Sequence, residues 1–247
     1  MIPDQPLSVR TSLGRNLTYG MLDRLGREIV IGSYDGQPFP TEAELTKQYA
    51  VSRSVTREAV KMLTTKGLLT ARPRQGTTIQ PDTAWNLFDP DVLRWLLERK
   101  FSLTLLRQFT DLRVAIEPAA AGLAAKAADA DGLAAIDAGF RRMVDAEEGN
   151  DDPLESDIAF HVAILQASGN PFYAQFRDLV ITALQTSIRF TNRFKGRSAS
   201  LPAHEAVKRA IEAGDRAAAH AAMETIIRDV MVLIAQAETT EIRKNLP

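Results

Sequence analysis

The sequence predicts a mainly α-helical protein, with an N-terminal winged helix-turn-helix followed by a C-terminal bundle of six or seven helices. Two short helical segments follow each other closely between residues 41 and 66. Two strand-like segments joined by a turn come directly after them. From residue 90 onward nearly every segment has helical periodicity. A chain of 247 residues is long enough for two domains with separate hydrophobic cores.

The N-terminal segment is expected to be a mobile arm followed by one amphipathic helix. Residues 1–16 contain two prolines and show no clear period, which is typical of an arm. Residues 17–31 place Leu22, Leu25 and Ile29 on one side of a helix. This apolar side should pack against the helix pair that follows.

The helix pair has start signals at both of its members. Thr41 and Glu44 have the spacing of a capping box, which marks the start of the first helix. Ser52 is the N-cap candidate of the second helix, only a few residues after the first one ends. The second helix carries four apolar residues at helical spacing: Val55, Ala59, Met62 and Leu63.

A basic face lies opposite this apolar face. Arg53, Arg57 and Lys61 are four residues apart, so they share one side of the second helix. Taken alone, such a stripe is most often a solvated helix face. Two short helices joined by a tight turn, with the second one basic, form the helix-turn-helix arrangement.

A wing is predicted directly after the second helix. Residues 68–72 and 77–80 have the composition of short strands, and the Pro73–Gly76 segment between them has turn chemistry. The turn carries Arg74 beside Gly76, where the missing side chain lets the backbone approach a phosphate closely. A basic hairpin behind a basic helix favours DNA binding over the solvated-face interpretation.

Charge and composition agree with this division of the chain. The first 80 residues hold 11 Lys+Arg against 7 Asp+Glu, and the rest of the chain holds 19 against 24. A basic head on an acidic body suits a protein whose head meets DNA. The absence of cysteine excludes disulfides and thiolate chemistry and fits a reducing cytoplasm. No apolar run is long enough to span a membrane, and the N-terminus lacks the pattern of a signal peptide.

Residues 81–89 are interpreted as a linker that is well anchored. Trp85, Leu87 and Phe88 are large apolar side chains that need burial, so we expect them to pin the two domains together. Asp89 followed by a proline is a helix start, and we place the second domain at residues 90–240.

The second domain is predicted to contain helices only. Pro118 should break or kink the helix that begins near Leu103. Pro171 should open a long helix that runs to Ser187 or beyond, and Asp215 should cap the last one.

Asp157 and His161 in this domain are four residues apart, the spacing of metal ligands on one helix face. His204 lies near the start of a later helix, and Arg113 and Arg189 are candidate anion-binding residues. Each has an ordinary alternative, because Asp–His pairs at this spacing are often hydrogen-bonded surface pairs and lone arginines are usually ion-pair partners.

The first part of the chain resembles the winged helix-turn-helix of the GntR superfamily of bacterial transcription regulators. The similarity lies in Pro40–Leu45, Val51–Arg53, Thr56–Ala59, Leu63, Gly67–Leu68 and Gly76. Many fatty-acid-type members have arginine where this chain has Ala43, so one DNA contact is missing here. The resemblance and the basic face together give these expected DNA-binding residues: Ser52, Arg53, Ser54, Thr56, Arg57, Arg74, Gln75, Gly76 and Thr77.

The second part resembles the FCD ligand-binding domain of the FadR subfamily. The matching segments are Leu112–Arg113, Glu117–Ala120, Asp157–His161, Ser168–Pro171, His204–Glu205, Ala210–Ile211, Gly214–Asp215, Ala218 and Met223. In that domain an aspartate, the histidine four residues later and two further histidines hold a metal ion. Asp157, His161 and His204 match three of these positions, whereas the fourth falls at Ile226. His220, six residues earlier, lies on another helix face and is interpreted as a surface residue.

The resemblance implies a homodimeric, cytoplasmic repressor that leaves double-stranded operator DNA when it binds a small carboxylate. The expected effector-binding residues are Arg113, Asp157, His161, Arg189 and His204, with zinc, nickel or manganese as the candidate metal. The Trp85–Trp95 segment and Ile226 are similar to galactonate-responsive repressors, which points to a sugar acid. Two alternatives stay open: a metal-dependent enzyme built on a helical bundle, and a dimeric DNA-binding protein without a ligand.

Overall fold

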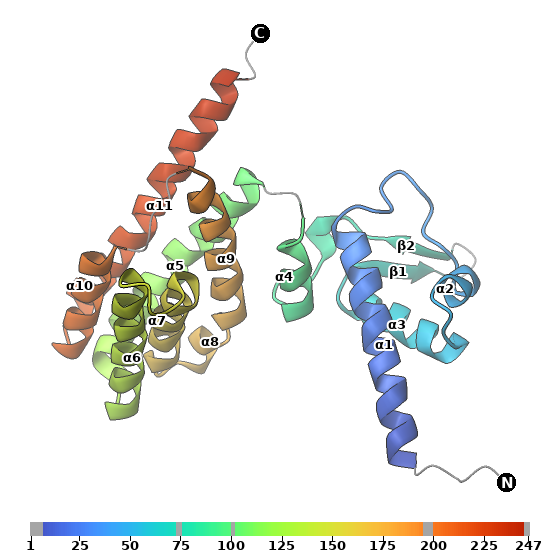
Figure 1. Ribbon diagram of the computed structural model, residues 1–247, viewed down its shortest axis with the longest axis horizontal. Coiled ribbons are helices and arrows are strands. Elements are labelled where there is room, and N and C mark those ends of the chain that lie inside the picture. Colours follow the sequence, from blue (N-terminus) through green and yellow to red (C-terminus); the bar gives the residue numbers. More distant parts are fainter. Residues whose placement is uncertain (1–6, 73–75, 100–101, 195–199, 245–247) are drawn as a thin grey trace. The chain divides into compact units, whose positions relative to one another are not determined.

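The computed structural model describes residues 7–72, 76–99, 102–194 and 200–244 (Figure 1). The chain forms two compact units, Met1–Lys100 and Phe101–Pro247. The predicted fold class, mainly α with one small wing, is confirmed. None of the helices within the described ranges is long and apolar enough to cross a membrane.

The first unit is a winged helix-turn-helix followed by a one-turn 3-10 helix and one short α-helix. Its first helix begins at Leu7, ten residues before the expected start, so the described part of the predicted arm is helical. Residues 1–6 lie outside the described ranges. The elements of this unit are α1 (Leu7–Val30), α2 (Glu42–Gln48), α3 (Arg53–Thr65), β1 (Leu69–Arg72), β2 (Gly76–Ile79), η1 (Asp82–Ala84) and α4 (Pro90–Leu96).

Local signals set the ends of the two central helices. Thr41 and Glu44 form the predicted capping box at the start of α2, and the Ser52 side chain accepts from the backbone N–H of Val55 at the start of α3. Between them Ala50 has φ +52°, in the left-handed region that costs a non-glycine residue free energy. The turn is held next to α1 because the Tyr49 hydroxyl donates to Glu28, at 2.7 Å.

The wing is an antiparallel pair in which Leu69 faces Ile79 and Arg72 faces Gly76. Leu68 and Leu69 are buried at its base, where β1 packs against α3. The exposed end of β1 therefore projects away from the core of this unit.

Residues 81–99, here called the connecting segment, pack on the first unit. The unit boundary therefore lies after residue 100 rather than at the predicted position 89/90. The buried Trp95 ring lies against Gly26 of α1, and its Nε1–H donates to Asp23 Oδ1 at 2.8 Å. The expected burial of Leu87 and Phe88 is wrong, because they are 43% and 58% exposed.

In its described part, the second unit contains only helices and no strands. Pro118 does not end α5, which continues to Ala127. Helix α5 packs against α7, α9, α10 and α11, and this packing offsets the hydrogen bond that the proline removes. The predicted long helix after Pro171 is instead two helices. The helices are α5 (Leu103–Ala127), α6 (Ala130–Glu147), α7 (Pro153–Ala167), α8 (Pro171–Ala174), α9 (Arg177–Phe194), α10 (Leu201–Glu212) and α11 (Arg216–Lys244).

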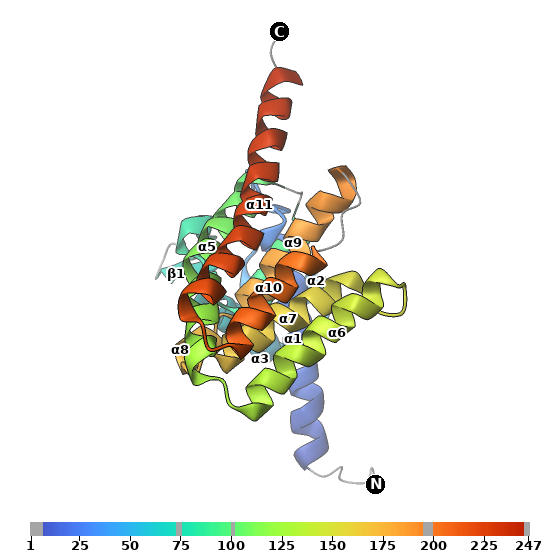
Figure 2. The same cartoon turned by 90° about the vertical axis from the view of Figure 1, so that its left-hand side faces the viewer.

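The core of this unit is formed where α7 is surrounded by its neighbours. Helix α11 runs beside α5 and α10, and α6 lies along α7 (Figure 2). Phe160 of α7 is fully buried, and its backbone lies so close to Gly139 that only glycine fits there. Asp215 caps α11 as predicted, since its Oδ1 accepts from two backbone N–H groups at 3.0 Å. This tight α6–α7 contact fixes the helix that carries Asp157 and His161.

Two alanine substitutions in α1 test the packing of the connecting segment. A Cβ at Gly26 would overlap the Trp95 ring, whereas a Cβ at Gly20 would meet no atom within 4 Å. Gly26→Ala is expected to lower the free energy of unfolding by about 1–3 kcal/mol through overpacking. Gly20→Ala should raise it by about 0.5–1 kcal/mol through helix propensity.

Urea unfolding followed by tryptophan fluorescence reports on this unit alone, because the two tryptophans of the chain, Trp85 and Trp95, both lie in it. Equal effects of the two substitutions would contradict the packing of Trp95 against α1.

Candidate DNA-binding surface and buried histidine site

The start of helix α3 presents a polar and basic surface. Ser52, Arg53, Ser54 and Arg57 are exposed, as is Lys61 one turn later. The two serine hydroxyls lie 2.9 Å apart while Ser52 also caps the helix. The predicted basic face of this helix is therefore solvent-accessible, with the helix N-terminus beside it.

Thr56 does not belong to this surface. It is fully buried, and its hydroxyl lies 3.0 Å from the Thr46 hydroxyl of α2 and 3.3 Å from the carbonyl oxygen of Ser52. Its predicted DNA contact is thus wrong, since the side chain holds the two helices together. The helical spacing of Thr56 with Ala59 and Leu63 is the signal that would have placed it on the apolar face.

The wing contributes an exposed glycine, Gly76, and an exposed basic residue, Arg72. Gly76 has φ +81° and open space around its Cα, so its backbone is free to approach a ligand closely. Thr77 beside it is half-buried, and Arg74 and Gln75 lie outside the described residues. Arg72, paired with Gly76 across the hairpin, is exposed and is a further basic candidate that the sequence analysis did not name.

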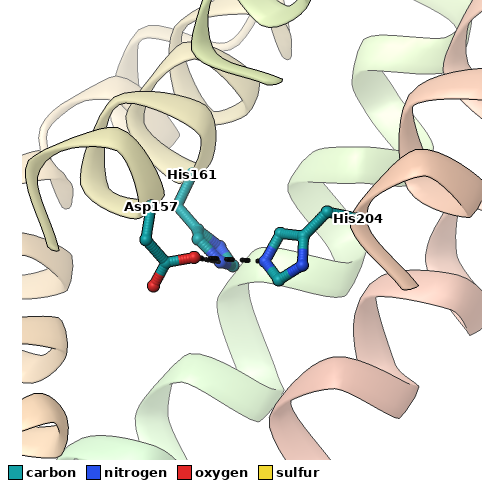
Figure 3. A group of neighbouring side chains, drawn as sticks. All are labelled: Asp157, His161 and His204. Carbon is teal, nitrogen blue, oxygen red and sulfur yellow. Dashed lines mark ion pairs between the residues drawn. The ribbon is translucent and has the colours of Figure 1, made fainter. Parts of the chain in front are cut away.

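The second unit brings the three predicted metal ligands together. Asp157 and His161 point from α7 toward His204 of α10, and all three are buried (Figure 3). Asp157 Oδ1 lies 3.1 Å from His204 Nε2 and 3.7 Å from His161 Nε2. One ligand atom from each residue lies within 4.8 Å of the others. The trio therefore has the spacing of a metal site.

Two outer contacts fix the proton positions of the histidines. His161 Nδ1 contacts Glu117 Oε2, and His204 Nδ1 lies 2.8 Å from the carbonyl oxygen of Ser200. Burial would raise the pKa of Glu117, but Arg113 and His161 lower it to about 2, so this carboxylate only accepts. A carbonyl oxygen also only accepts, so both Nδ1 atoms carry hydrogen. In neutral imidazoles this leaves both Nε2 lone pairs unprotonated.

These lone pairs converge on a carboxylate oxygen. Within the described part of the chain, neither Asp157 Oδ1 nor His204 Nε2 has a hydrogen bond of acceptable geometry, despite their 3.1 Å separation. Burial would raise the pKa of Asp157, but the positive charge of Arg113 contributes to lowering it, so the carboxylate is charged. Three buried acceptors that face one another repel unless a cation lies between them. The residues therefore fit a divalent metal, with Glu117 and Ser200 orienting its ligands.

The remaining predicted residues differ in their relation to this cluster. Arg113 is buried beside it and pairs with Glu117, with Nε 2.5 Å from Oε1. Arg189 belongs to α9, but its side chain lies outside the described part of the structure. His220 is exposed, in agreement with its interpretation as a surface residue, and Ile226 packs against the hydrophobic core. Glu117 was missed as a site residue, although its spacing of four from Arg113 was visible.

Comparison with known proteins identifies both units. A family model described as "Bacterial regulatory proteins, gntR family" matches residues 21–79, and one described as "FCD domain" matches residues 108–229. The galactonate operon transcriptional repressor of Escherichia coli (strain K12) is 34% identical over 217 residues, which cover 86% of this chain and 94% of that relative. This chain belongs to the GntR family. It is a GntR–FCD transcription regulator and not an enzyme.

Further relatives agree with this membership. The E. coli regulator YieP is 33% identical to the GntR–FCD chain over 227 residues, covering 90% of this chain and 98% of the relative. Two solved structures share the fold alone. E. coli McbR/YncC has a TM-score of 0.51 at 17% identity over 90% of this chain and 98% of its own. The Listeria monocytogenes protein Lar has a TM-score of 0.54 at 15% identity over 95% and 99%.

Arginine substitutions test the DNA-binding surface. Arg53→Ala or Arg57→Ala should each weaken binding to a specific operator duplex by roughly 1–3 kcal/mol, because each would remove an expected base contact. Fluorescence anisotropy at several salt concentrations measures this. Arg228→Ala, which removes an exposed arginine of α11, is the matched control and should bind like the wild type. Unchanged affinity in both α3 variants would contradict the assignment of this helix.

Proposed function

We propose that this GntR–FCD regulator is a repressor whose operator binding is released by a small carboxylate, a sugar acid such as an aldonate. The proposal rests mainly on one observation: the buried side chains of Asp157, His161 and His204 meet near the Arg113 guanidinium. Supporting it, a relative that matches most of this chain is named as a galactonate operon repressor. A sugar acid offers a carboxylate with an adjacent hydroxyl, which suits a site with both a metal and an arginine.

In this proposal the metal is held by Asp157, His161 and His204. Zinc, nickel and manganese are the candidates, because imidazole nitrogen and carboxylate oxygen ligands suit these ions. When bound, the ion supplies positive charge for the oxygens of the effector. The chain has an isoleucine at position 226, where the family places a fourth ligand, so three protein ligands leave positions open for water or effector.

Arg113 is the proposed partner of the effector carboxylate. A guanidinium has five N–H donors, and the hydrogen bonds to Glu117 use Nε and Nη2. Arg113 therefore stays oriented by Glu117 while it offers further donors to an anion. Arg189 is the second proposed effector-binding arginine.

For DNA binding, the proposal is that the protein acts in the cytoplasm as a homodimer. Ser52, Arg53, Ser54 and Arg57 of α3 are proposed to reach the operator, together with the wing residues Arg74, Gln75, Gly76 and Thr77. One winged helix covers only a short half-site, so two copies are needed for an inverted repeat. Residues 101–240 are the proposed effector-binding and dimerisation domain.

Metal titration tests the buried site. In isothermal titration of chelator-treated protein with Zn²⁺, Ni²⁺ or Mn²⁺, the wild type should bind one ion per chain. Asp157→Asn should weaken that binding at least about tenfold, since changes even to outer residues of metal sites have effects of this size. His220→Gln replaces an exposed histidine and should leave it unchanged. No binding in the wild type, or equal binding in both variants, would count against the metal.

A conservative substitution tests the effector site. Arg113→Lys keeps the charge next to Glu117 but loses the forked geometry that pairs with a carboxylate. It should bind operator normally and need at least about tenfold more D-galactonate for release, a loss of roughly 1.4 kcal/mol. The matched control is Arg142→Lys. Arg142 lies in α6 and forms an ion pair with Asp151, so this variant should need the wild-type concentration of D-galactonate.

Anisotropy titrations with effector give the release curves. If Arg113→Lys gave the same release curve as the wild type, the effector carboxylate would not bind at Arg113. Isothermal titration of the wild type with a panel of sugar acids separates this proposal from a regulator without a ligand.

A further inference from the structure

The end of helix α3 is fastened to the connecting segment by a lysine that is largely removed from solvent. Lys66 caps α3, and its side chain is 13% exposed. Its Nζ lies 2.7 Å from both carboxylate oxygens of Asp89 and 2.8 Å from Asp91 Oδ2. Burial would lower the pKa of Lys66, but the two aspartates raise it, so the ammonium group stays charged. The Lys66 ammonium group is therefore paired within the chain, whereas Arg53, Arg57 and Lys61 are exposed.

Backbone contacts reinforce this attachment at the same place. The N–H of Asn86 donates to the carbonyl oxygen of Lys66 at 2.9 Å. Gly67 has φ +80°, and a Cβ there would overlap the carbonyl oxygen of Ala84 and lie 3.2 Å from Trp85 Cα. The connecting segment therefore crosses directly over the C-terminal end of α3, too close for any side chain at position 67.

The far end of the connecting segment is fixed as well. Asp89 uses the same carboxylate to cap α4, where its Oδ1 accepts from the N–H groups of Asp91 and Val92. Trp95 of α4 is seated against α1, and Arg94 Nη2 lies 2.5 Å from Asp23 Oδ1 and 3.0 Å from Asp91 Oδ1. The connecting segment is thus held both at the end of α3, where Lys66 makes the contact, and at α1.

We propose that Lys66 is a positioning residue for operator recognition, because its ion pairs with Asp89 and Asp91 make the connecting segment and helix α3 move as one body. The connecting segment is the covalent route from the second unit to the DNA-binding unit. A displacement that arrives through it reaches the recognition helix at its C-terminal end instead of being absorbed between the units. The part of this inference that concerns effector release rests on the proposed function.

Hydrogen exchange tests the attachment without any effector. The experiment uses the whole 247-residue chain and a DNA duplex selected by the wild type from a random-sequence pool. In the wild type, this DNA should slow amide exchange both in α3 and in residues 86–97. In Lys66→Met, which keeps a long apolar stem but removes the charge, slowing should persist in α3 and largely disappear, to less than about twofold, in residues 86–97. Identical slowing of residues 86–97 in both proteins would overturn the proposal.

Operator release gives the second readout. If D-galactonate lowers wild-type operator affinity by a typical coupling factor of roughly 5- to 150-fold, the factor in Lys66→Met should fall below about twofold. D-galactonate binding itself, measured by isothermal titration, should be unchanged. Lys66→Arg, which again pairs with two carboxylates, should restore the wild-type factor. A Lys66→Met protein with the full factor would overturn the proposal.

Control variants keep the result interpretable. Lys126→Met removes an exposed lysine of α5 and should behave like the wild type in both assays. If Lys66→Met does not fold, the double variant Asp89→Asn, Asp91→Asn replaces it. It removes both carboxylate partners of Lys66, while the asparagine side-chain oxygen at position 89 can still cap α4. A wild-type exchange pattern in that variant would also overturn the proposal. A wild type that does not respond to D-galactonate contradicts the proposed effector class, and the exchange comparison then decides the role of Lys66.

Discussion

The carboxylate of Glu117, buried between Arg113 and His161, fixes the orientation and tautomer of His161 in the candidate metal site of the second unit. Its low pKa makes it a pure acceptor, so it fixes the hydrogen of His161 on Nδ1 and turns Nε2 toward Asp157. The Ser200 carbonyl does the same for His204. Once both rings are oriented and neutral, three acceptors face one another out of water, an arrangement that a bound divalent cation would stabilise. The packing of α5, α7 and α10 serves this arrangement.

The DNA-binding unit uses its cations in two different ways. Arg53 and Arg57 stay exposed on the first turns of α3, where a phosphate or base edge can reach them. Lys66 at the other end of the same helix is paired with Asp89 and Asp91 and carries structure instead. One end of α3 is thus exposed and basic, and the other end is attached to the chain that leads to the second unit. In the proposal made for Lys66, this polarity couples operator binding to the second unit through a single short helix.

Local chemistry made much of the fold predictable, whereas long-range packing did not. The capping box at Thr41 and the Asp157–His161 pair depend on neighbours within one helix turn, so spacing revealed them. Glu117 and His161 are 44 residues apart in the sequence and lie on different helices. No helical periodicity predicts a contact between them. The assignment of α4 to the first unit likewise depends on a distant pair, Trp95 and Gly26. Thr56 was misplaced because a polar residue type outweighed its apolar spacing.

Anomalous diffraction from crystals grown with Zn²⁺ shows whether the contacts of Glu117 and Ser200 leave three acceptors that bind a cation. We expect one anomalous peak per chain, bound by Nε2 of His161, Nε2 of His204 and the carboxylate of Asp157. The Nδ1 atoms should still face Glu117 and Ser200. A map without a peak, in which His204 Nε2 instead forms a direct hydrogen bond with Asp157, would contradict it, because a proton alone would then close the site.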